Sequence, residues 1–343
     1  MSRAPKQPII YQEKLKVPEK FLRFATPKEV ALYRAERLKC DTIAELGAGI
    51  GGQTIAFAKT CKKVIAVEID KNKIKILESN LKKLGIKNVE LILGSSLDEN
   101  IIKRVSQKKP NVIFCDTERP EKAERTLDRI KPSVNKILEE YSQITEKIAI
   151  EIPPLTKDIE NIKTNYSFEK EFISLNKQLN RLTLYFGKLK QDEVSAISLP
   201  SREKIIYSNP KKVKDSNQLD NYKYLYTVDP TIIISNLLQE LSKKYDAQSI
   251  LLDKPVLFSN KKINSAFLTG YEILSKCKND KEIIIQELKK LNAKTVVLNY
   301  KVAPEDYWKI RNSYENELSG NKEICLFIDD KENDAILTEK LKN

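Results

Sequence analysis

A glycine-rich segment in the first part of the chain places the strongest constraint on its fold. The segment GAGIGG (47–52) follows the short apolar run TIAEL (42–46) and opens a stretch with helical character that continues to Thr60. Glycine permits left-handed backbone angles and lets the backbone approach a ligand where a Cβ would otherwise stand. A strand, a tight glycine turn and a helix in this order are typical of nucleotide-binding α/β sheets.

The chain continues as an alternation of short apolar runs and amphipathic segments. We expect strands at 64–68, 89–93, 111–116 and 148–152, a helix at 71–85, and an antiparallel strand pair at 168–176 and 181–189. This alternation indicates a Rossmann-like α/β domain with a parallel sheet and crossover helices. Ahead of it we expect a helix that runs to Lys39, with Thr26 as its N-cap and Pro27 at its first helical position.

A change in composition divides the chain. Residues 207–223 are rich in Asn, Asp, Lys and Ser, which predicts a linker or exposed loop. Beyond it we expect helices at 231–245 and 281–292 and strands at 295–302 and 323–329. The predicted domains are a basic arm and helix (1–39), a ligand-binding domain (40–204) and a second, smaller α/β domain (205–343).

The residue types that the chain lacks exclude several kinds of site. Histidine does not occur in the 343 residues, which excludes a Ser-His-Asp hydrolase and leaves carboxylates, Tyr, Lys or Arg for acid–base chemistry. The five cysteines are scattered and never form a CxxC pair, so we expect neither a disulfide framework nor a zinc site. We therefore predict that the protein has no metal centre.

The charge of the chain favours a polyanionic partner. The net charge is +13, and the first 39 residues hold ten Lys and Arg against four Glu. A basic surface of this size attracts RNA, although Lys- and Ile-rich chains are also typical of A/T-rich genomes and charge-dense surfaces of thermophiles. Because the sequence has no run of about 18 apolar residues and no secretory signal at its start, we expect a cytoplasmic protein without a membrane partner.

A carboxylate ahead of the glycine turn distinguishes two classes of ligand. Glu45 precedes Gly47 by two residues, where it can meet the ammonium of a methionine moiety, directly or through water. Dinucleotide-binding turns hold a pyrophosphate at this point, which a carboxylate would repel. Glu68 closes the next strand, as needed to accept hydrogen bonds from both hydroxyls of a ribose. Since both classes share that second acid, Glu45 makes the distinction and favours S-adenosylmethionine.

The turn after the strand at 89–93 is the expected adenine position. Ser95 and Ser96 offer only hydroxyl groups there, so we expect backbone groups near Leu97 to contribute to adenine recognition. Ile69 is placed to cover one face of the base. The alternative is that the two serines cap the helix that follows.

Residues 42–188 resemble the class I S-adenosylmethionine-dependent methyltransferase fold. FCDTERPEKAERTLDRIKPSVNKILEEY (114–141) and IAIEIPP (148–154) are similar to methyltransferases that carry a C-terminal THUMP-like domain. The same similarity extends to RFATP (23–27), YRAERL (33–38), LYTVDPTII (225–233), LLDKPVLFSN (251–260) and LTGYEIL (268–274). Members of this family are regarded as RNA methyltransferases related to the cap-guanine N2 methylating enzymes.

The resemblance implies S-adenosylmethionine as the cofactor and RNA as the partner. It implies a cofactor site formed by Thr26, Glu45, Gly47, Ala48, Gly49, Gly51, Glu68, Ile69, Ser95, Ser96, Leu97 and Asp116. A THUMP-like second domain would grip the RNA backbone together with the basic arm, and Lys and Arg contacts would make the affinity depend on salt.

Acceptor chemistry is expected directly after the strand at 111–116. Methyl transfer is an in-line displacement, so the protein must align donor and nucleophile and, for an amine, accept a proton. Amino-methylating enzymes carry Asp or Asn, Pro, Pro and an aromatic residue here, and this chain keeps only the acid, Asp116. The THUMP-like family commonly shows Asp-Pro-Ala-Arg, which Asp116 and Arg119 match and Thr117 and Glu118 do not.

We assign two catalytic residues from this segment. Asp116 is the expected acceptor for the amino group, or a wall of the cofactor pocket, and Arg119 the ligand of a phosphate or a base edge. The alternative for Arg119 is a surface ion pair with Glu121 or Glu124. Because the aromatic residue of the pattern is missing, Phe24 is a candidate for base stacking, with a place in the core as its alternative.

Three functions stay open from the sequence. The favoured one is methylation of a base, such as guanine N2, in tRNA or another structured RNA, with the base unstacked or in a loop. The second is a small-molecule or protein methyltransferase on the same fold. The third is a catalytically inactive RNA-binding or assembly protein, which the altered residues 117–119 keep in consideration.

Overall fold

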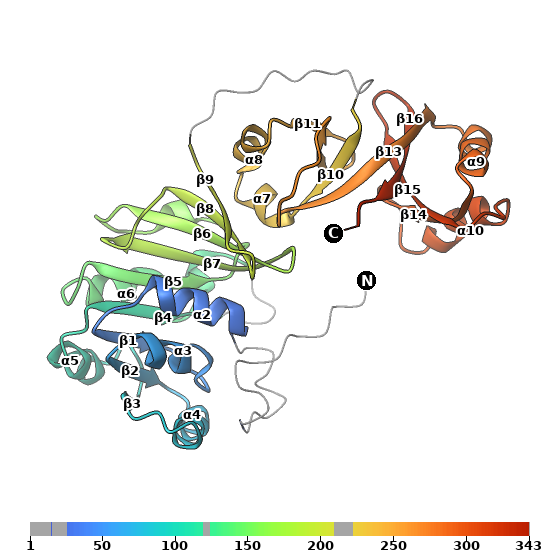
Figure 1. The fold of residues 1–343 in the computed structure, drawn as a ribbon. Helices are drawn as coiled ribbons and strands as arrows, with labels where there is room; N and C mark the ends of the chain where they lie inside the picture. The colour runs from blue at the N-terminus through green and yellow to red at the C-terminus, as the bar shows by residue number, and fades with distance from the viewer. Residues whose placement is uncertain (1–14, 16–25, 119–123, 209–221, 343) are drawn as a thin grey trace. The chain divides into compact units, whose positions relative to one another are not determined.

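The computed structural model describes Leu15 and residues 26–118, 124–208 and 222–342. The chain divides into two compact units between Lys204 and Ile205 (Figure 1). Each unit is built on its own mixed β-sheet, and the two are described separately below.

Among the described residues, nine strands form the first sheet in the order β3-β2-β1-β4-β5-β7-β6-β8-β9. Their bounds are β1 (Thr42–Leu46), β2 (Lys63–Glu68), β3 (Val89–Leu93), β4 (Val112–Asp116), β5 (Lys147–Ile152), β6 (Phe168–Leu175), β7 (Gln178–Gly187), β8 (Val194–Leu199) and β9 (Glu203–Ile206). Strands β1 to β5 are parallel, and β7 is antiparallel to both β5 and β6. The predicted Rossmann-like sheet and the antiparallel pair after it are confirmed.

Helices cover both faces of the first sheet (Figure 1). They are α2 (Lys28–Arg37), α3 (Gly52–Thr60), α4 (Lys71–Lys83), α5 (Glu99–Gln107) and α6 (Val134–Tyr141). Because successive side chains of a strand point to opposite faces, each central strand contributes to two cores. Ile43 and Phe114 pack with α2, α3 and α4, whereas Ala44 and Ile113 pack with α5 and α6.

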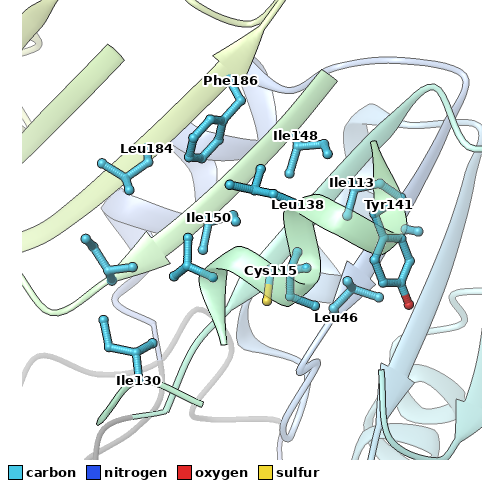
Figure 2. Close-up of a cluster of buried hydrophobic side chains, with 14 of the residues drawn as sticks. Leu46, Ile113, Cys115, Ile130, Leu138, Tyr141, Ile148, Ile150, Leu184 and Phe186 are labelled. Carbon is cyan, nitrogen blue, oxygen red and sulfur yellow. The ribbon is translucent and has the colours of Figure 1, made fainter. Parts of the chain in front are cut away.

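Figure 2 shows the core on the α6 side, where Leu138 and Tyr141 lie among the apolar side chains of β1, β4 and β5. The Tyr141 hydroxyl donates a hydrogen bond of 2.8 Å to the carbonyl of Ser96, which satisfies the one polar atom of this buried ring. This contact ties the turn after β3 to α6. The core on the α6 side therefore helps to fix the turn at the carboxyl end of β3.

The start of α2 differs from the sequence prediction. Pro27 occupies the N-cap position without a side-chain hydrogen bond, and the helix begins at Lys28, so Thr26 as N-cap and Pro27 as the first helical residue were wrong. Thr26 is instead buried against α3, where a Cβ on Gly52 would lie 3.4 Å from its backbone nitrogen. A tertiary contact, and not the helix end, determines the position of Thr26.

The second sheet has the order β11-β12-β10-β13-β16-β15-β14 in the described part of the chain. Its strands are β10 (Tyr224–Val228), β11 (Gln248–Leu251), β12 (Pro255–Ser259), β13 (Leu268–Lys278), β14 (Ala293–Leu298), β15 (Lys322–Asp329) and β16 (Asp334–Lys340). The helices are α7 (Pro230–Ile234), α8 (Leu238–Lys244), α9 (Lys281–Lys290) and α10 (Tyr307–Glu315). Only β14 and β15 pair in parallel, and the other pairs are antiparallel.

One element of the second unit was predicted wrongly. The segment 231–245, expected as a single helix, is divided into α7 and α8. Asn236 lies between them with a φ of 58°, and the Leu237 nitrogen donates to the carbonyl of Ile232 at 3.0 Å. Asparagine tolerates this left-handed conformation, and a helix that closes in this way satisfies its last carbonyls. The break between α7 and α8 places the Leu237 side chain in the core, where it is fully buried.

None of the helices in the described ranges is both long enough and apolar enough to cross a lipid bilayer.

Candidate cofactor and acceptor site

The glycine turn after β1 lies between the ends of β2 and β4. The backbone nitrogens of Gly47 and Ala48 donate to the carbonyl of Val67 at 2.9 and 3.0 Å. Gly47 has a φ of 85°, and a Cβ there would lie 2.6 Å from the carbonyl oxygen of Asp116. Gly51, with a φ of 96°, is the N-cap of α3 and has the left-handed conformation. The turn is therefore closed to larger residues and forms a cradle of backbone atoms over the sheet.

Glu68 at the end of β2 holds this turn. One of its carboxylate oxygens accepts the Gly49 nitrogen at 2.7 Å, and the other accepts the Asp70 nitrogen at 2.9 Å. The side chain was predicted to bind a ribose, and in the structure it also orders the glycine turn. Since a carboxylate has about four lone-pair sites, two acceptor positions stay available for hydroxyl groups.

Glu45 is a buried carboxylate with an unpaired oxygen. It is 1% exposed on β1, and its Oε2 has no hydrogen-bond partner among the described residues. Burial raises the pKa of Glu45 to about 8. The negative charges of Asp116 and Glu68 act in the same direction, and the Thr54 hydroxyl beside it and the charge of Arg34 offset these effects only in part. A buried, unpaired carboxylate oxygen is energetically unfavourable, and a cationic donor would relieve it. A methionine ammonium, directly or through water, fits this position, and a pyrophosphate does not.

Two large apolar side chains are exposed at the carboxyl ends of β2 and β3. Ile69 is 69% exposed and Leu93 is 46% exposed, although both follow buried strand residues. Glu68 and Leu93 are register partners, so these groups lie at one edge of the cradle. Exposed apolar groups at the rim of a concave backbone site are suited to contact a planar base.

The structure of the turn after β3 excludes one of the two interpretations of Ser95 and Ser96. The Ser95 hydroxyl accepts the Leu97 nitrogen at 3.3 Å, so it closes its own turn. Asp98, and not a serine, caps α5, and its side chain accepts the backbone nitrogens of the first helical turn. The alternative that the serines cap the helix was therefore wrong. Ser95, Ser96 and Leu97 are all partly exposed beside the cradle.

Asp116 and Glu151 lie opposite each other on neighbouring parallel strands. The register pairs Asp116 at the end of β4 with Glu151 in β5. Burial, followed by the charge of Glu151, raises the pKa of Asp116 to about 7. A carboxyl group that titrates near neutral pH is suited to accept or return a proton.

Glu151 lies between two guanidinium groups. Arg34 of α2 forms an ion pair with it from one side, and Arg181 of β7 approaches it to 2.7 Å from the other. Arg34 is fully buried and also donates to Gln53 at 3.0 Å and to the Thr183 hydroxyl at 3.3 Å. The charge of Glu151 is thus compensated by residues from a helix and a strand far away in the sequence.

Sequence reasoning missed Arg34, Glu151 and Arg181. The signal was a charge within an apolar pattern: Arg34 lies midway between the buried Val30 and Leu38 on one helical stripe, and Glu151 interrupts the apolar strand IAIEI. Charged residues are rarely fully buried unless they are paired, so such a position indicates a partner elsewhere in the fold.

The residues after Asp116 are fixed to their surroundings. The Thr117 hydroxyl donates to the carbonyl of Glu151 at 2.6 Å. The backbone of Glu118 pairs with Lys131, and its carboxylate meets Lys73 at 2.6 Å. The two residues that depart from the family pattern are therefore used as structural ties.

Arg119 and Phe24 lie outside the described residues, so their predicted roles stay predictions. Glu121, one expected ion-pair partner of Arg119, is also outside them. Over the ranges that are described, no group of three or more Cys, Asp or Glu side chains is arranged to hold a metal ion.

Comparison with known proteins shows which proteins share this fold. Residues 40–189 match the family model described as RNA cap guanine-N2 methyltransferase. The crystal structure of a methyltransferase candidate from Porphyromonas gingivalis W83 covers 96% of this chain and 84% of its own, with a TM-score of 0.78 and 13% identity. At this identity the similarity shows the fold alone, and it extends over both units.

The curated relatives match shorter segments. A probable cobalt-precorrin-6B C(15)-methyltransferase (decarboxylating) of Methanocaldococcus jannaschii is 30% identical over 108 residues, 26% of this chain and 59% of the relative. A probable ribosomal RNA small subunit methyltransferase A of Methanosarcina acetivorans is 44% identical over 63 residues, 18% of this chain and 23% of the relative. The chain thus spans less than two thirds of the length of either.

The strand order, the glycine cradle and these matches agree. The relatives and the family match support an S-adenosylmethionine-dependent methyltransferase. The first unit has the class I S-adenosylmethionine-dependent methyltransferase fold, and within it residues 40–189 match the RNA cap guanine-N2 methyltransferase family.

Proposed function

We propose that this protein is an S-adenosylmethionine-dependent methyltransferase that acts on an exocyclic amino group of a base in structured RNA, with guanine N2 of a tRNA as the specific candidate. The observation that carries the proposal is the buried, unpaired Glu45 oxygen beside the glycine cradle and Asp116. A cationic amino-acid moiety satisfies that oxygen, and its sulfonium group would extend toward the acceptor side of the sheet.

S-adenosylmethionine supplies a methyl group activated by the positive charge on its sulfur. We assign its contacts to Thr26, Glu45, Gly47, Ala48, Gly49, Gly51, Glu68, Ile69, Ser95, Ser96, Leu97 and Asp116. Glu45 would hold the ammonium, Glu68 the ribose hydroxyls, and Ile69 with the turn after β3 the adenine. Thr26 would close the cradle from the side of α2, since its backbone packs against Gly52.

Asp116 is the proposed acceptor residue. The amine nitrogen forms a bond to the methyl carbon while the carbon–sulfur bond breaks and its electron pair stays on sulfur. The nitrogen then loses a proton, which the Asp116 carboxylate accepts. Because burial and the charge of Glu151 raise the pKa of Asp116 to about 7, this carboxylate binds a proton more strongly than an ordinary aspartate and is still partly ionised at neutral pH.

An RNA substrate is supported by three observations. The matching family model is described as an RNA cap guanine-N2 methyltransferase, and one relative is named a ribosomal RNA methyltransferase. The net charge of +13 favours a polyanion. We propose that the second unit is THUMP-like and binds the RNA backbone, and that Arg119 holds a phosphate or a base edge near Asp116.

The test is transfer of a labelled methyl group to total RNA from cells that lack the gene. We expect transfer by the wild-type protein and a loss of at least about 100-fold in Asp116→Ala, the lower range for removing a general base. Calorimetry should show cofactor affinity reduced by less than about tenfold, because only the Asp116 contact is lost while the ammonium and ribose contacts remain. Asp128→Ala, which removes an aspartate whose side chain is 71% exposed, is the matched control and should keep full activity.

Two outcomes contradict the proposal. Full activity of Asp116→Ala would show that Asp116 is not the proton acceptor. Binding of cofactor and RNA without any transfer would instead indicate an RNA-binding protein without methyltransferase activity. The altered sequence at residues 117–119 is the argument for this alternative.

A second candidate is methylation of a small molecule. The observation in its favour is the match over 108 residues to a relative named as a cobalt-precorrin methyltransferase. Under this alternative the label would appear in the small-molecule fraction of a cell extract and not in RNA. Running both fractions in one assay separates the two substrates.

A further inference from the structure

One face of the first sheet gathers ionisable side chains from four strands. Ile43, Phe114, Ala149 and Tyr185 belong to the core on the α2 and α3 side. Side chains two residues along a strand point to the same face. Glu45, Asp116, Glu151 and, four residues from Tyr185, Arg181 therefore lie on that face as well. Arg34 reaches the same face from α2 above it.

The charges of this cluster are almost balanced. Arg34 and Arg181 carry two positive charges, and Glu151 and Asp116 carry two negative charges when both are ionised. Both guanidinium groups contact Glu151, and in the described part of the chain neither forms an ion pair with Asp116. Glu45 adds a further negative charge, so the cluster with all its carboxylates ionised has an excess that a cationic ligand would offset.

Arg34 is held in one conformation. Its guanidinium bonds to Glu151 of β5, Gln53 of α3 and the hydroxyl of Thr183 in β7, and it lies 4.8 Å from the centre of the Phe114 ring. These contacts come from three strands and a helix around a fully buried side chain. The planar guanidinium is suited to such fixed, divergent contacts, and a lysine ammonium could not make them all.

We propose that Arg34 is a positioning residue for Asp116: it holds Glu151 in place across the strand pair and, with Arg181, keeps the Asp116 carboxylate ionised and directed at the acceptor. This inference rests on the proposed function, because it assigns a further residue to the same site. Arg34 does not touch the reacting atoms in this assignment. It acts through Glu151 and through its own charge.

The groups that face Asp116 determine how the proposal is tested. They are Glu45 on β1, Cys115 and Glu118 on either side of Asp116, Glu151 on β5, Arg34 on α2 and Arg181 on β7. Burial and Glu151 raise the pKa of Asp116, while Arg181 and Arg34 lower it. Removing either arginine should therefore raise this pKa, and removing Glu151 should lower it.

The experiment follows the Asp116 carboxyl carbon by NMR in protein labelled with ¹³C at aspartate, with Asp116→Asn to assign the signal. We expect Arg34→Gln to raise the titration midpoint by about one pH unit or more and Glu151→Gln to lower it by a similar amount. The double variant should return close to the wild-type midpoint. The low-pH limb of the kcat profile should move in the same direction in each variant.

Two further variants separate positioning from folding. Arg34→Lys keeps the positive charge, so the titration midpoint of Asp116 should return most of the way to the wild-type value. Its kcat should stay reduced. Arg37→Gln removes the next arginine of the same helix, which is partly buried and binds Glu169 and Glu171 instead. It should lower stability and leave the Asp116 midpoint unchanged. This comparison shows whether the midpoint responds to the loss of any arginine of this helix or to Arg34 alone.

The inference is overturned if Arg34→Gln stays folded and its Asp116 midpoint and pH profile equal those of the wild type. It is also overturned if Arg37→Gln moves the midpoint as far as Arg34→Gln does. The NMR titration needs no substrate, so it reports on the Arg34 inference even if the wild-type protein transfers no methyl group. An absence of transfer alone would count against the proposed function only.

Discussion

Arg34 and Arg37 both lie on α2 and both bind carboxylates of the first sheet, but Arg34 is buried whereas Arg37 is partly buried, and their surroundings differ. Arg37 binds Glu169 at 2.6 Å and also Glu171, both on β6. The hydroxyls of Tyr33 and Tyr185 donate to Glu171 at 2.6 and 3.0 Å. Every carboxylate oxygen of this cluster has a donor.

The Arg37 cluster is saturated with donors. Glu169 additionally accepts the hydroxyl of Ser195 at 2.6 Å and the backbone nitrogens of Gln191 and Asp192 at 3.0 and 3.3 Å. Burial alone would raise the pKa of Glu169, but Arg37 and these hydrogen bonds outweigh it and hold the pKa below its ordinary value. Glu169 is thus stabilised in its charged form by the fold itself, whereas burial raises the pKa of Glu171 although both of its oxygens have donors.

The hydrogen bonding of the Arg34 cluster is incomplete, with an acceptor atom and a donor atom left unpaired in the described ranges. Glu45 Oε2 and Arg34 Nε have no hydrogen-bond partner among the described residues, and the pKa values of Glu45 and Asp116 are raised, chiefly by burial. A completed buried network fixes a helix on a sheet, whereas an incomplete one leaves groups that a ligand can satisfy. On the proposed function, the Arg37 cluster belongs to the scaffold and the Arg34 cluster to the site.

The largest expected effect is on stability, in the complete cluster. Arg37→Met should lower the free energy of unfolding by about 3–5 kcal/mol, because it leaves Glu169 and Glu171 buried without their cation. Urea denaturation measures this change. Arg202→Met, which removes an exposed ion pair with Glu36, is the control and should cost at most about 1 kcal/mol. Equal losses in the two variants would contradict the buried cluster as a scaffold.

The next effect is on ligand binding, in the incomplete cluster. Glu45→Gln should weaken S-adenosylmethionine binding by about 100-fold, or about 2.7 kcal/mol, because the ammonium loses a charged acceptor. Its stability without ligand should not fall, since the variant removes a buried carboxylate with an unpaired oxygen. Calorimetry measures the affinity for S-adenosylmethionine, and thermal melting measures the stability without ligand. A stability loss with unchanged affinity would make Glu45 part of the scaffold.

A smaller effect is expected from pH. The pKa of Glu45, raised by burial to about 8, means that the free protein holds a proton there that a cationic ligand expels. Affinity for S-adenosylmethionine should therefore rise with pH, by roughly 20-fold between about pH 6 and 7.5, a range in which most of the ligand ammonium is still protonated. Calorimetry in two buffers of different ionisation enthalpy detects the released proton, and Glu45→Gln should flatten the dependence.

The smallest effect is expected at the rim of the cradle. Ile69→Ala should weaken cofactor binding by about threefold to tenfold, as expected for the loss of a few buried methylene contacts with the adenine. Ile234→Ala in the second unit, where the side chain is 40% exposed, should leave the affinity unchanged. An Ile69→Ala protein with wild-type affinity would place the adenine elsewhere.

Some features of the first unit could be predicted from the sequence alone. The run from β1 through the glycine turn to Glu68 was predictable because strand, turn and helix are encoded within about thirty neighbouring residues. The Rossmann-like sheet followed from the same local alternation. Several strands of the second unit, such as β13 with its mixed pattern LTGYEILSKCK, carry no clear periodicity and were not predicted.

The break at Asn236 and the placement of Thr26 show where local patterns mislead. A continuous helical pattern favoured one helix at 231–245, but burial of Leu237 requires the chain to turn there. Thr26 has the residue type and spacing of an N-cap, but packing against Gly52 determines its position. In both cases a tertiary contact outweighs a local preference of about 1 kcal/mol.

By itself the sequence determined the fold of the first unit, the glycine turn and the acids Glu45, Glu68 and Asp116, because each lies at a fixed distance from a strand end. Only the tertiary structure decided that Arg34 and Glu151 meet, although they are 117 positions apart. It also decided that Glu45 is buried with an oxygen unpaired while Glu169 is fully bonded. Burial and partnership of a charge depend on strand register and helix docking, which no local pattern encodes.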